Sequence, residues 1–308
     1  MLVVAALGGN ALLQRGQPLT AENQRANVRA ASAALADVVR AGHRLVVTHG
    51  NGPQVGLLAL QGAAYKPDEA YPLDVLGAET GGMIGYMIEQ ELENALDHAH
   101  PVATLLTQVV VDGQDPSFRN PTKFIGPVYS RDEAESRAKA AGWSIAQDGD
   151  KWRRVVPSPA PQDIPDLRVL RLLLDQGVIV ICTGGGGIPV LRLPDGSMTG
   201  IEAVIDKDAA SALLARRLGA DALLLLTDVD AVYRDFGTDK ATKETWLSPQ
   251  DALQFNAPAG SMAPKLAAAA AFAVEGGLAA IGRLEDATQI IIGAAGTQVS
   301  DKSEGKER

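Results

Sequence analysis

Two lysines occupy positions where a helix is expected to begin, and a cation is electrostatically unfavourable there. Lys207 lies between Asp206 and Asp208 in AVIDKDAASALL, which we interpret as a strand followed by a helix. Lys265 occurs in GSMAPKLAAAAAFA, at the start of an alanine-rich helical stretch. Because the amino end of a helix carries a partial positive charge, each lysine needs a compensating anion, either a flanking aspartate or a bound phosphate. The pattern indicates an anion site; a helix-capping role for Asp208 and a solvent-facing Lys265 are the structural alternatives.

Three glycine-rich turns each follow an apolar run that reads as a buried strand. They are LGGN at residues 7–10, THGNGPQVG at 48–56 and CTGGGGIP at 182–189. In a parallel sheet such turns share one edge, and glycine lets unpaired backbone N–H groups approach an anion closely. The residues predicted to bind substrate and phosphate are Gly8, Gly9, Asn10, Gly50, Asn51, Gly52, Gly185 and Gly186.

Polar and aromatic side chains follow a further apolar run. LLLLTDVDAVYRDF places Asp228 and Tyr233 just beyond the expected strand 222–227. A few polar groups beside an aromatic ring suit a ribose or adenine pocket, so we predict that this strand end faces a nucleotide. Asp206 and Met262 are assigned to the same nucleotide-binding side.

Composition narrows the class of protein. The 308 residues carry a formal net charge of −9, which argues against a general affinity for nucleic acid or for an anionic membrane surface. The single cysteine, Cys182, ends an apolar run, so we predict a buried side chain rather than a nucleophile. We expect a cytoplasmic protein, because no apolar run approaches the length of about 18 residues that spans a membrane and no signal peptide is visible.

Several motifs that would indicate other chemistry are absent from the sequence. There is no P-loop, no complete G-x-G-x-x-G fingerprint and no G-x-S-x-G esterase turn. There is no H-E-x-x-H and no Cys/His cluster, so we predict no structural or catalytic zinc and no metal-ligating side chains. Of the four histidines, His49 is the one beside a glycine turn, and the others are expected at the surface.

Apolar runs alternate with helical patterns along the chain. The runs are continuously apolar, which indicates strands buried on both faces of a mainly parallel sheet with helices above and below it. The expected strands are 2–7, 45–48, 102–111, 178–182, 222–227 and 278–281, with 290–292 as a further candidate. The expected helices are 20–41, a stretch after the second glycine turn, 74–95, 167–176, 208–218 and 262–275.

Residues 113–162 interrupt this alternation. The segment contains many prolines and two tryptophans, at positions 143 and 152, and it is locally basic in an otherwise acidic chain. A structureless excursion of this length is uncommon in a compact domain, and the aromatic content argues against disorder. We therefore interpret it as an inserted lid that carries Lys123, the alternative being a surface excursion without a role.

The motifs together resemble those of carbamate kinases, a branch of the amino acid kinase family. LGGNAL, THGNGPQVG, NPTKFIGPVY, TGGGGIPV, EAVIDKDAAS, LLTDVDAVY and GSMAPK occur in the family's order and cover almost the whole chain. The resemblance implies an α/β fold, a three-layer αβα sandwich around a mainly parallel sheet, formed by residues 1–299. It makes 113–162 a small protruding subdomain, and the polar residues 300–308 are expected to form a disordered tail.

The resemblance also implies an activity. Carbamate kinases are homodimers that transfer a phosphoryl group reversibly between ATP and carbamate, giving ADP and carbamoyl phosphate, with Mg²⁺, commonly in arginine breakdown. Many relatives, such as acetylglutamate kinases, place a lysine where this sequence has Ala6, and the segment 1–14 contains no cation. The resemblance therefore assigns the missing charge to Lys207, Lys265 and Lys123.

The catalytic roles follow from the chemistry of phosphoryl transfer, which needs alignment and charge neutralisation. Lys207 and Lys265 are expected to neutralise the phosphates, Asp208 to orient both lysines, and Lys123 to close over the anion. Carbamate is already an anionic nucleophile, so no general base is required. Two alternatives stay open: another carboxylate or phosphate-monoester kinase of this family, and a nucleotide- or anion-binding member without catalytic activity.

Overall fold

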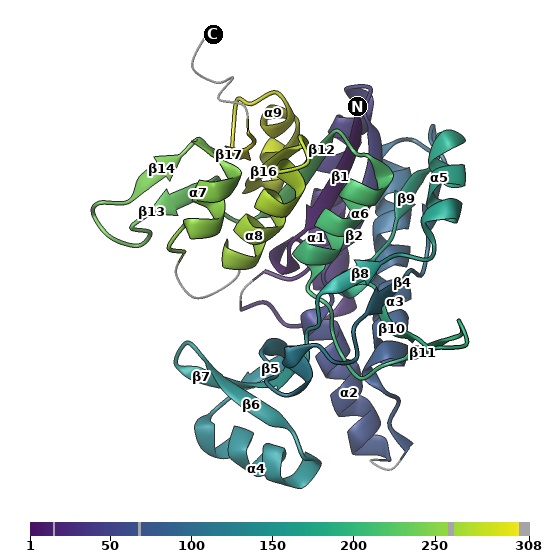
Figure 1. The fold of residues 1–308 in the computed structure, drawn as a ribbon, viewed down its shortest axis with the longest axis vertical. Coiled ribbons are helices and arrows are strands. Elements are labelled where there is room, and N and C mark those ends of the chain that lie inside the picture. Colours follow the sequence, from purple (N-terminus) through teal and green to yellow (C-terminus); the bar gives the residue numbers. More distant parts are fainter. Residues whose placement is uncertain (15, 67–68, 258–261, 302–308) are drawn as a thin grey trace.

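The largest element of the protein is a mostly parallel sheet. The computed structural model describes residues 1–14, 16–66, 69–257 and 262–301. The strands of this sheet are β1 (Leu2–Leu7), β2 (Arg44–His49), β3 (Val102–Thr104), β9 (Ile179–Ile181), β12 (Ala222–Thr227), β15 (Trp246–Leu247), β16 (Leu278–Arg283) and β17 (Thr297–Val299). Their order is β15-β17-β16-β12-β1-β2-β9-β3. Figure 1 labels the central strands from β17 to β9. The pairing of β16 with β17 is antiparallel, and the strands on either side of β1 run parallel to it.

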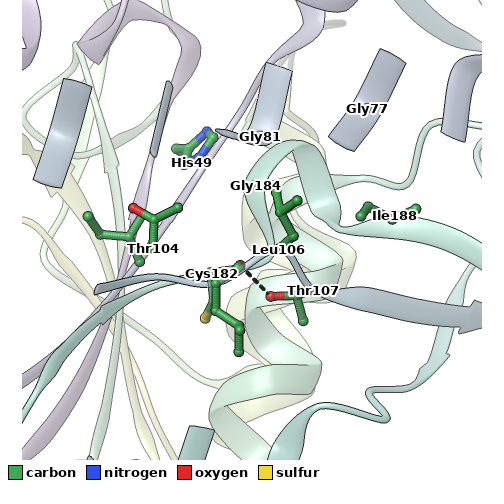
Figure 2. Close-up of a pocket in the computed structure, with 11 residues that line it drawn as sticks. His49, Gly77, Gly81, Thr104, Leu106, Thr107, Cys182, Gly184 and Ile188 are labelled. Atoms are coloured by element: carbon green, nitrogen blue, oxygen red, sulfur yellow. Dashed lines mark hydrogen bonds between the residues drawn. The ribbon is translucent and has the colours of Figure 1, made fainter. Parts of the chain in front are cut away.

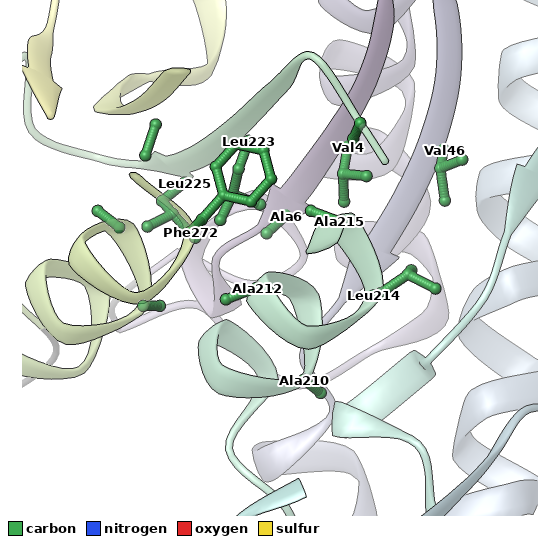
Figure 3. Close-up of a cluster of buried hydrophobic side chains, with 14 of the residues drawn as sticks. Val4, Ala6, Val46, Ala210, Ala212, Leu214, Ala215, Leu223, Leu225 and Phe272 are labelled. Carbon is green, nitrogen blue, oxygen red and sulfur yellow. The ribbon is translucent and has the colours of Figure 1, made fainter. Parts of the chain in front are cut away.

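Both faces of the sheet are covered, which confirms the predicted three-layer sandwich. Successive residues of β1 alternate between two apolar clusters: Val3 belongs to one and Val4 to the other, and neither is exposed. The first cluster includes α1 (Ala21–Arg40), α3 (Leu73–Ala95) and α9 (Ala287–Ile291). The second includes α5 (Leu167–Asp175), α6 (Lys207–Leu218) and α8 (Met262–Ala273), and Figure 3 shows Phe272 of α8 over Leu223 and Leu225 of β12.

The helices begin and end where the sequence provides the matching residues. Thr20 Oγ1 accepts the N–H of Asn23 at 3.2 Å and caps α1, as predicted. α6 ends at Gly219, whose φ of 66° is favourable for glycine and strained for other residues. Within the described residues, no helix is both long and apolar enough to span a bilayer.

Three smaller sheets extend from the sandwich. One has the order β11-β10-β4-β8, the second is the pair β13-β14, and the third has the order β5-β7-β6. Their strands are β4 (Gln108–Val111), β5 (Lys123–Tyr129), β6 (Ser144–Asp148), β7 (Lys151–Val156), β8 (Pro161–Asp163), β10 (Ile188–Arg192), β11 (Met198–Gly200), β13 (Val232–Arg234) and β14 (Thr242–Glu244). The remaining helices are α2 (Gly52–Tyr65), α4 (Arg131–Ala141) and α7 (Pro249–Gln254).

The sheet β5-β7-β6 and helix α4 form a small unit set apart from the main sheet (Figure 1). It lies within the segment that the sequence analysis interprets as an inserted lid. It meets the rest of the protein through an apolar cluster that includes Val55, Ile125 and Val156. It also meets it through a pair of glycines: a Cβ added to Gly56 of α2 would lie 2.0 Å from Gly126 Cα of β5. Since two backbones meet there, the position of β5 is fixed against α2, and Lys123 stands at the first residue of β5.

Three predicted strands differ from the structure. Residues 102–111 form two strands in different sheets, because the chain turns at Leu105–Thr107, where Thr107 Oγ1 donates to Leu105 O at 2.9 Å. The apolar run at 290–292 completes α9, and Ile290 is buried in a core cluster instead of pairing with a strand. Residues 203–205 are buried but are not a strand, so α6 begins after an irregular segment.

The first residue of the predicted tail contacts the sandwich. Ser300 Oγ accepts the indole N–H of Trp246 at 3.1 Å, which holds this residue against the sandwich. Residues 302–308 lie outside the described residues.

Candidate active site

The centre of the site is a carboxylate between two ammonium groups. Lys265 Nζ lies 3.0 Å from Asp208 Oδ2, and Lys207 Nζ is bound to Asp208 Oδ1. The three side chains are 4%, 6% and 11% exposed for Lys265, Asp208 and Lys207. The structure therefore brings together two predicted lysines and their predicted partner, and it excludes a solvent-facing Lys265. The group carries two positive charges and one negative charge, which leaves a net positive charge beneath the surface.

The burial of this group shifts its ionisation. Burial by itself would raise the pKa of Asp208, but the two lysines lower it far below its usual range, so the carboxylate stays charged. Burial lowers the pKa of Lys207 to about 8; Asp208 opposes this shift, and the positive charge of Lys265 adds to it. At neutral pH the Lys207 ammonium is still protonated, but it is a cation that a bound anion would stabilise further.

Helix α6 and the turn after β2 hold Lys207 in place. Ser211 Oγ donates to Lys207 O at 2.7 Å, and it lies 2.6 Å from Thr48 Oγ1 at the end of β2. The aliphatic carbons of Lys207 pass Gly50, where an added Cβ would lie 3.7 Å from Lys207 Cδ. The second glycine turn is thus beside the ammonium cluster. Thr48 and Ser211 could not be identified from the sequence, because a hydroxyl in a helix or a strand carries no distinctive pattern.

The third glycine turn packs against three other segments. An added Cβ would lie 2.6 Å from His49 Nε2 at Gly184, 2.1 Å from Asn51 Nδ2 at Gly185, and 2.4 Å from Ile205 O at Gly186. Gly185 and Gly186 also have positive φ angles, 69° and 94°. Glycine is therefore needed here for close packing of protein segments. Binding of an anion by Gly185 and Gly186 remains a prediction.

Two buried polar side chains fix the second turn. The His49 ring lies with Nδ1 3.1 Å from Gly50 O, and because a carbonyl only accepts, Nδ1 carries the proton. Burial lowers the pKa of His49 to about 4, so the ring is neutral. Asn51 Nδ2 donates to Thr80 Oγ1 of α3 at 2.8 Å, and Asn51 is 4% exposed. His49 was singled out from the sequence by its place beside the glycine turn, whereas no motif pointed to Thr80.

The first glycine turn is only partly available to a ligand. The N–H of Gly8 donates to Leu226 O of β12 at 3.0 Å, so this donor already has a partner within the protein, and donation from Gly8 to a phosphoryl group stays a prediction. Gly8 is needed because an added Cβ would lie 2.9 Å from that same oxygen. By contrast, an added Cβ on Gly9 has no atom within 4 Å among the described residues, so the turn is open there. The Asn10 side chain lies outside the described part of the chain.

The inserted unit contributes Lys123 to the site. Lys123 Nζ donates to Asp206 Oδ2 at 2.6 Å, and the two side chains are 30% and 25% exposed. Asp206 is the residue immediately before Lys207, so the structure brings the third predicted lysine to the edge of the cluster. The sequence analysis assigned Asp206 to the nucleotide; the structure shows it paired with Lys123 and capping α6.

The predicted nucleotide residues lie at the end of β12, the strand beside β1. Thr227 Oγ1 donates to Asp228 Oδ1 at 3.1 Å. The Tyr233 hydroxyl donates to Asp230 at 3.0 Å, and Lys243 of β14 binds the same carboxylate at 3.0 Å. Met262 begins α8, three residues before Lys265, and is partly buried. Their contact with a nucleotide stays a prediction; Asp230 and Lys243 are additional polar residues that the motif LLTDVDAVY did not single out.

The described part of the protein has a small cavity and a groove, and neither is lined by Lys207, Asp208 or Lys265. A cavity of about 10 Å³ is lined by His49, Thr107, Cys182 and Gly184 (Figure 2). It has room for about one water molecule and not for a nucleotide. A shallow groove near Asp163 and Arg217 lies beside β4 and β10. We locate the site by its charged groups and glycine turns, because a phosphate site open to solvent does not need a deep apolar cavity.

Metal-binding side chains are not clustered. Among the described residues, no group of three or more His, Cys, Asp or Glu side chains is placed to hold a metal ion. Asp206 and Asp208 both already bind lysines. A metal that serves this site would therefore be held mainly by phosphate oxygens of a nucleotide.

The site and the sandwich define a phosphoryl-transfer protein, and comparison with known proteins gives its family. Residues 1–281 match the amino acid kinase family, and the chain belongs to that family. Kinases of this kind act on ATP with a divalent metal ion.

The similar proteins are carbamate kinases. The carbamate kinase of Rhizobium meliloti is 56% identical over 97% of this chain and 93% of its own length. The carbamate kinase of Haemophilus influenzae is 55% identical over 99% of this chain and 98% of its own length. The solved structure of carbamate kinase from Giardia lamblia bound to citric acid has a TM-score of 0.92, with 38% identity, and covers 97% of this chain and 98% of its own.

Proposed function

We infer that this chain is an ATP-dependent kinase whose acceptor is carbamate, and that it interconverts ATP plus carbamate with ADP plus carbamoyl phosphate. The observation that supports this most directly is the buried group of Lys207, Asp208 and Lys265, which carries a net positive charge where two anions would meet. High identity to carbamate kinases over nearly the full length identifies the acceptor.

The reaction needs few proton transfers, which fits these residues. In the direction of ATP formation, a β-phosphate oxygen of ADP bonds to the phosphorus of carbamoyl phosphate. The bond from phosphorus to the carbamate oxygen breaks, and that oxygen keeps the electron pair. Carbamate leaves as an anion, so no general acid is required. Lys207 and Lys265 offset the negative charge of the phosphates, and Asp208 keeps both ammonium groups in one position.

We propose the following roles for the remaining site residues. Gly9 and Asn10 donate backbone N–H groups to the transferring phosphoryl group. Gly50, Asn51 and Gly52 surround the carbamate carboxylate, since Gly50 adjoins Lys207. Lys123 binds the same anion from the inserted unit.

The nucleotide and its metal complete the proposal. Asp228, Tyr233 and Met262 line the nucleotide side, because they follow β12 or begin α8, next to Lys265. We propose Mg²⁺ as the metal: the phosphates of the nucleotide would hold it, and it would offset the negative charge between them.

An assay of ATP formation tests the function directly. The purified chain is given carbamoyl phosphate, ADP and Mg²⁺, and ATP is measured by a coupled enzyme. We expect ATP to form, and Lys265→Met to lower kcat by about 10²–10³. Acetyl phosphate replaces carbamoyl phosphate in the control, which tests whether the enzyme is specific for the carbamoyl group. ATP formation that depends equally on both phosphates would contradict the assignment of carbamate, and no ATP from either would contradict kinase activity.

We further propose a cytoplasmic homodimer that works in arginine catabolism, on the basis of the family resemblance. One observation fits an assembly: Val75, Met83 and Tyr86 of α3 are exposed by 37%, 38% and 54%. These side chains recur near the period of a helix face, and such an exposed apolar stripe is suited to a protein interface. Light scattering on the purified chain checks it, and a monomer at micromolar concentration would contradict the dimer.

A further inference from the structure

Asp206 makes two different kinds of contact with its two oxygens. Oδ1 accepts the backbone N–H groups of Asp208 at 2.9 Å and Ala209 at 3.1 Å, and so caps α6. Oδ2 binds the Lys123 ammonium at 2.6 Å. One carboxylate therefore connects the helix that carries Lys207 with the inserted unit, 83 residues away along the chain.

The two ion-pair groups differ in their exposure to solvent. The side chains of Lys265 and Asp208 are 4% and 6% exposed, whereas those of Lys123 and Asp206 are 30% and 25% exposed. A partly exposed pair contributes little net stability, because water and salt compete for both partners. Lys123 can therefore exchange its partner more easily than the buried lysines can.

The position of Lys123 is also set by the backbone. Lys123 is the first residue of β5, and Phe124 O of that strand lies 3.7 Å from where a Cβ of Gly52 would stand. Among the described residues, the pair of Lys123 with Asp206 is the ion pair that connects 113–162 with the rest of the chain. Breaking this pair would free the charged end of Lys123 without moving the glycine contact between β5 and α2.

We propose that Asp206 is a positioning residue that acts as a resting counter-ion for Lys123 and competes with the phosphoryl group of the substrate for it. When the anion binds, Lys123 changes partner from Asp206 to a phosphoryl oxygen, while Oδ1 of Asp206 continues to cap α6. No covalent bond changes in this step. The competition lowers the affinity for carbamoyl phosphate and makes the anion easier to release. This inference rests on the proposed function.

The variant Asp206→Asn separates the two roles, because asparagine is a good helix cap but has no negative charge. Removing the competing carboxylate should lower the KM for carbamoyl phosphate about two- to fivefold, the value expected for a partly exposed ion pair. The KM for ADP should change less. Asp206→Ser, which also caps without charge, should behave in the same way.

The double variant shows whether the effect acts through Lys123. In a Lys123→Ala chain the KM should already be raised, and adding Asp206→Asn should change it less than about twofold. A KM that is unchanged or higher in Asp206→Asn would overturn the proposal. An equal decrease with and without Lys123 would overturn it too, because Asp206 would then act only by repelling the substrate.

Hydrogen exchange of the ligand-free protein gives a readout that does not depend on activity. Asp206→Asn, Lys123→Ala and the double variant should all increase amide exchange in residues 123–156 to a similar extent, and exchange in 207–218 should be unchanged. Faster exchange confined to 207–218 would show that only the helix cap was affected, against the proposal. If the wild-type chain forms no ATP, the proposed function fails while this test of the ion pair still gives its own result.

Discussion

Lys265 Nζ lies 3.0 Å from Asp208 Oδ2, and the side chains of these two residues, 57 positions apart, are 4% and 6% exposed. An ion pair this deeply buried is costly to break from one side, because the remaining charge loses its partner without regaining water. Here the consequence depends on which partner is removed. Without Lys265, Asp208 still pairs with Lys207; without the charge of Asp208, two ammonium groups are left together.

This asymmetry predicts different stabilities for two inactive variants. Asp208→Asn should lower the free energy of unfolding by about 3–5 kcal/mol, because it leaves uncompensated buried cations. Lys265→Met removes one charge, keeps the side-chain volume and leaves a neutral pair, so we expect a loss of about 1 kcal/mol. Urea unfolding measures both, and circular dichroism shows that each variant is folded. Equal losses in the two variants would contradict the description of the site as two cations that share one carboxylate.

The lowered pKa of Lys207 predicts that activity decreases at alkaline pH. Its pKa is lowered to about 8, chiefly by burial, so the free enzyme loses this positive charge as the pH rises through that value. We expect kcat/KM for ATP formation to fall about tenfold per pH unit above pH 8, since kcat/KM reports the ionisation of the free enzyme. Lys207→Arg is the control, because a guanidinium stays charged to beyond about pH 12. A similar decrease in the arginine variant would assign the titration to another group.

The sandwich could be predicted well from the sequence, because each buried strand is marked by the apolar residues of its own segment. Strands buried on both faces appear as continuous apolar runs, and β1 shows why: its alternate residues enter two different cores. The failures occurred where an apolar run has two possible partners. Residues 102–111 are apolar throughout, yet the turn at Leu105–Thr107 passes the chain from one sheet to another. Ile290 could fill a core equally well from a strand or from a helix.

The site was predicted to the extent that charge pattern determined it. Lysines at helix starts needed an anion, and Asp208 is that anion for both Lys207 and Lys265. The pairing of Lys123 with Asp206 could not be predicted, because neither residue has a pattern that specifies the other. The packing of the third glycine turn could not be predicted either, since close approach to a ligand and close approach to another protein segment require the same residue.

His49 makes stability dependent on pH. Burial lowers the pKa of this ring to about 4, whereas in the unfolded chain it takes its ordinary value of 6.5. Between these values the unfolded chain binds a proton that the folded chain excludes, so stability falls as the pH is lowered from about 7 to 4. The shift corresponds to about 3 kcal/mol. The measurement is the difference in unfolding free energy between the wild type and His49→Asn across this range.

The asparagine variant is a suitable reference because its amide can still donate to Gly50 O but does not titrate. Relative to wild type, His49→Asn should gain stability as the pH falls, and the other acid-sensitive groups cancel in the comparison. A difference that is the same at pH 4 and at pH 7 would show that the pKa of His49 is the same in the folded and the unfolded chain, against the lowered value.

Because Gly56 contacts Gly126 so closely, adding a single methyl group at Gly56 should displace the inserted unit. In Gly56→Ala the new Cβ would lie 2.0 Å from Gly126 Cα, and since both are backbone positions, β5 must move. Lys123 moves with it, so we expect the KM for carbamoyl phosphate to rise about tenfold or more. Gly62→Ala, on the same helix, is the control: its Cβ would lie 3.7 Å from Ala70 Cβ, an ordinary contact. A KM change of similar size in Gly62→Ala would contradict a specific role for the glycine pair.

Cys182 predicts that the folded chain resists thiol reagents. The side chain is 1% exposed, and burial raises its pKa to about 12, so almost none of it is the reactive thiolate at neutral pH. Since it is the single cysteine, any modification of a thiol must occur there. Iodoacetamide at pH 8 should leave the mass of the native protein unchanged for hours. When the chain is unfolded in about 8 M urea, the same reagent should add one carbamidomethyl group. ATP formation should also survive the native treatment. Rapid alkylation of the folded protein would show that the end of β9 opens to solvent. His49 and Gly184, which line the same cavity as Cys182, would then be mobile and would not be a fixed support of the site.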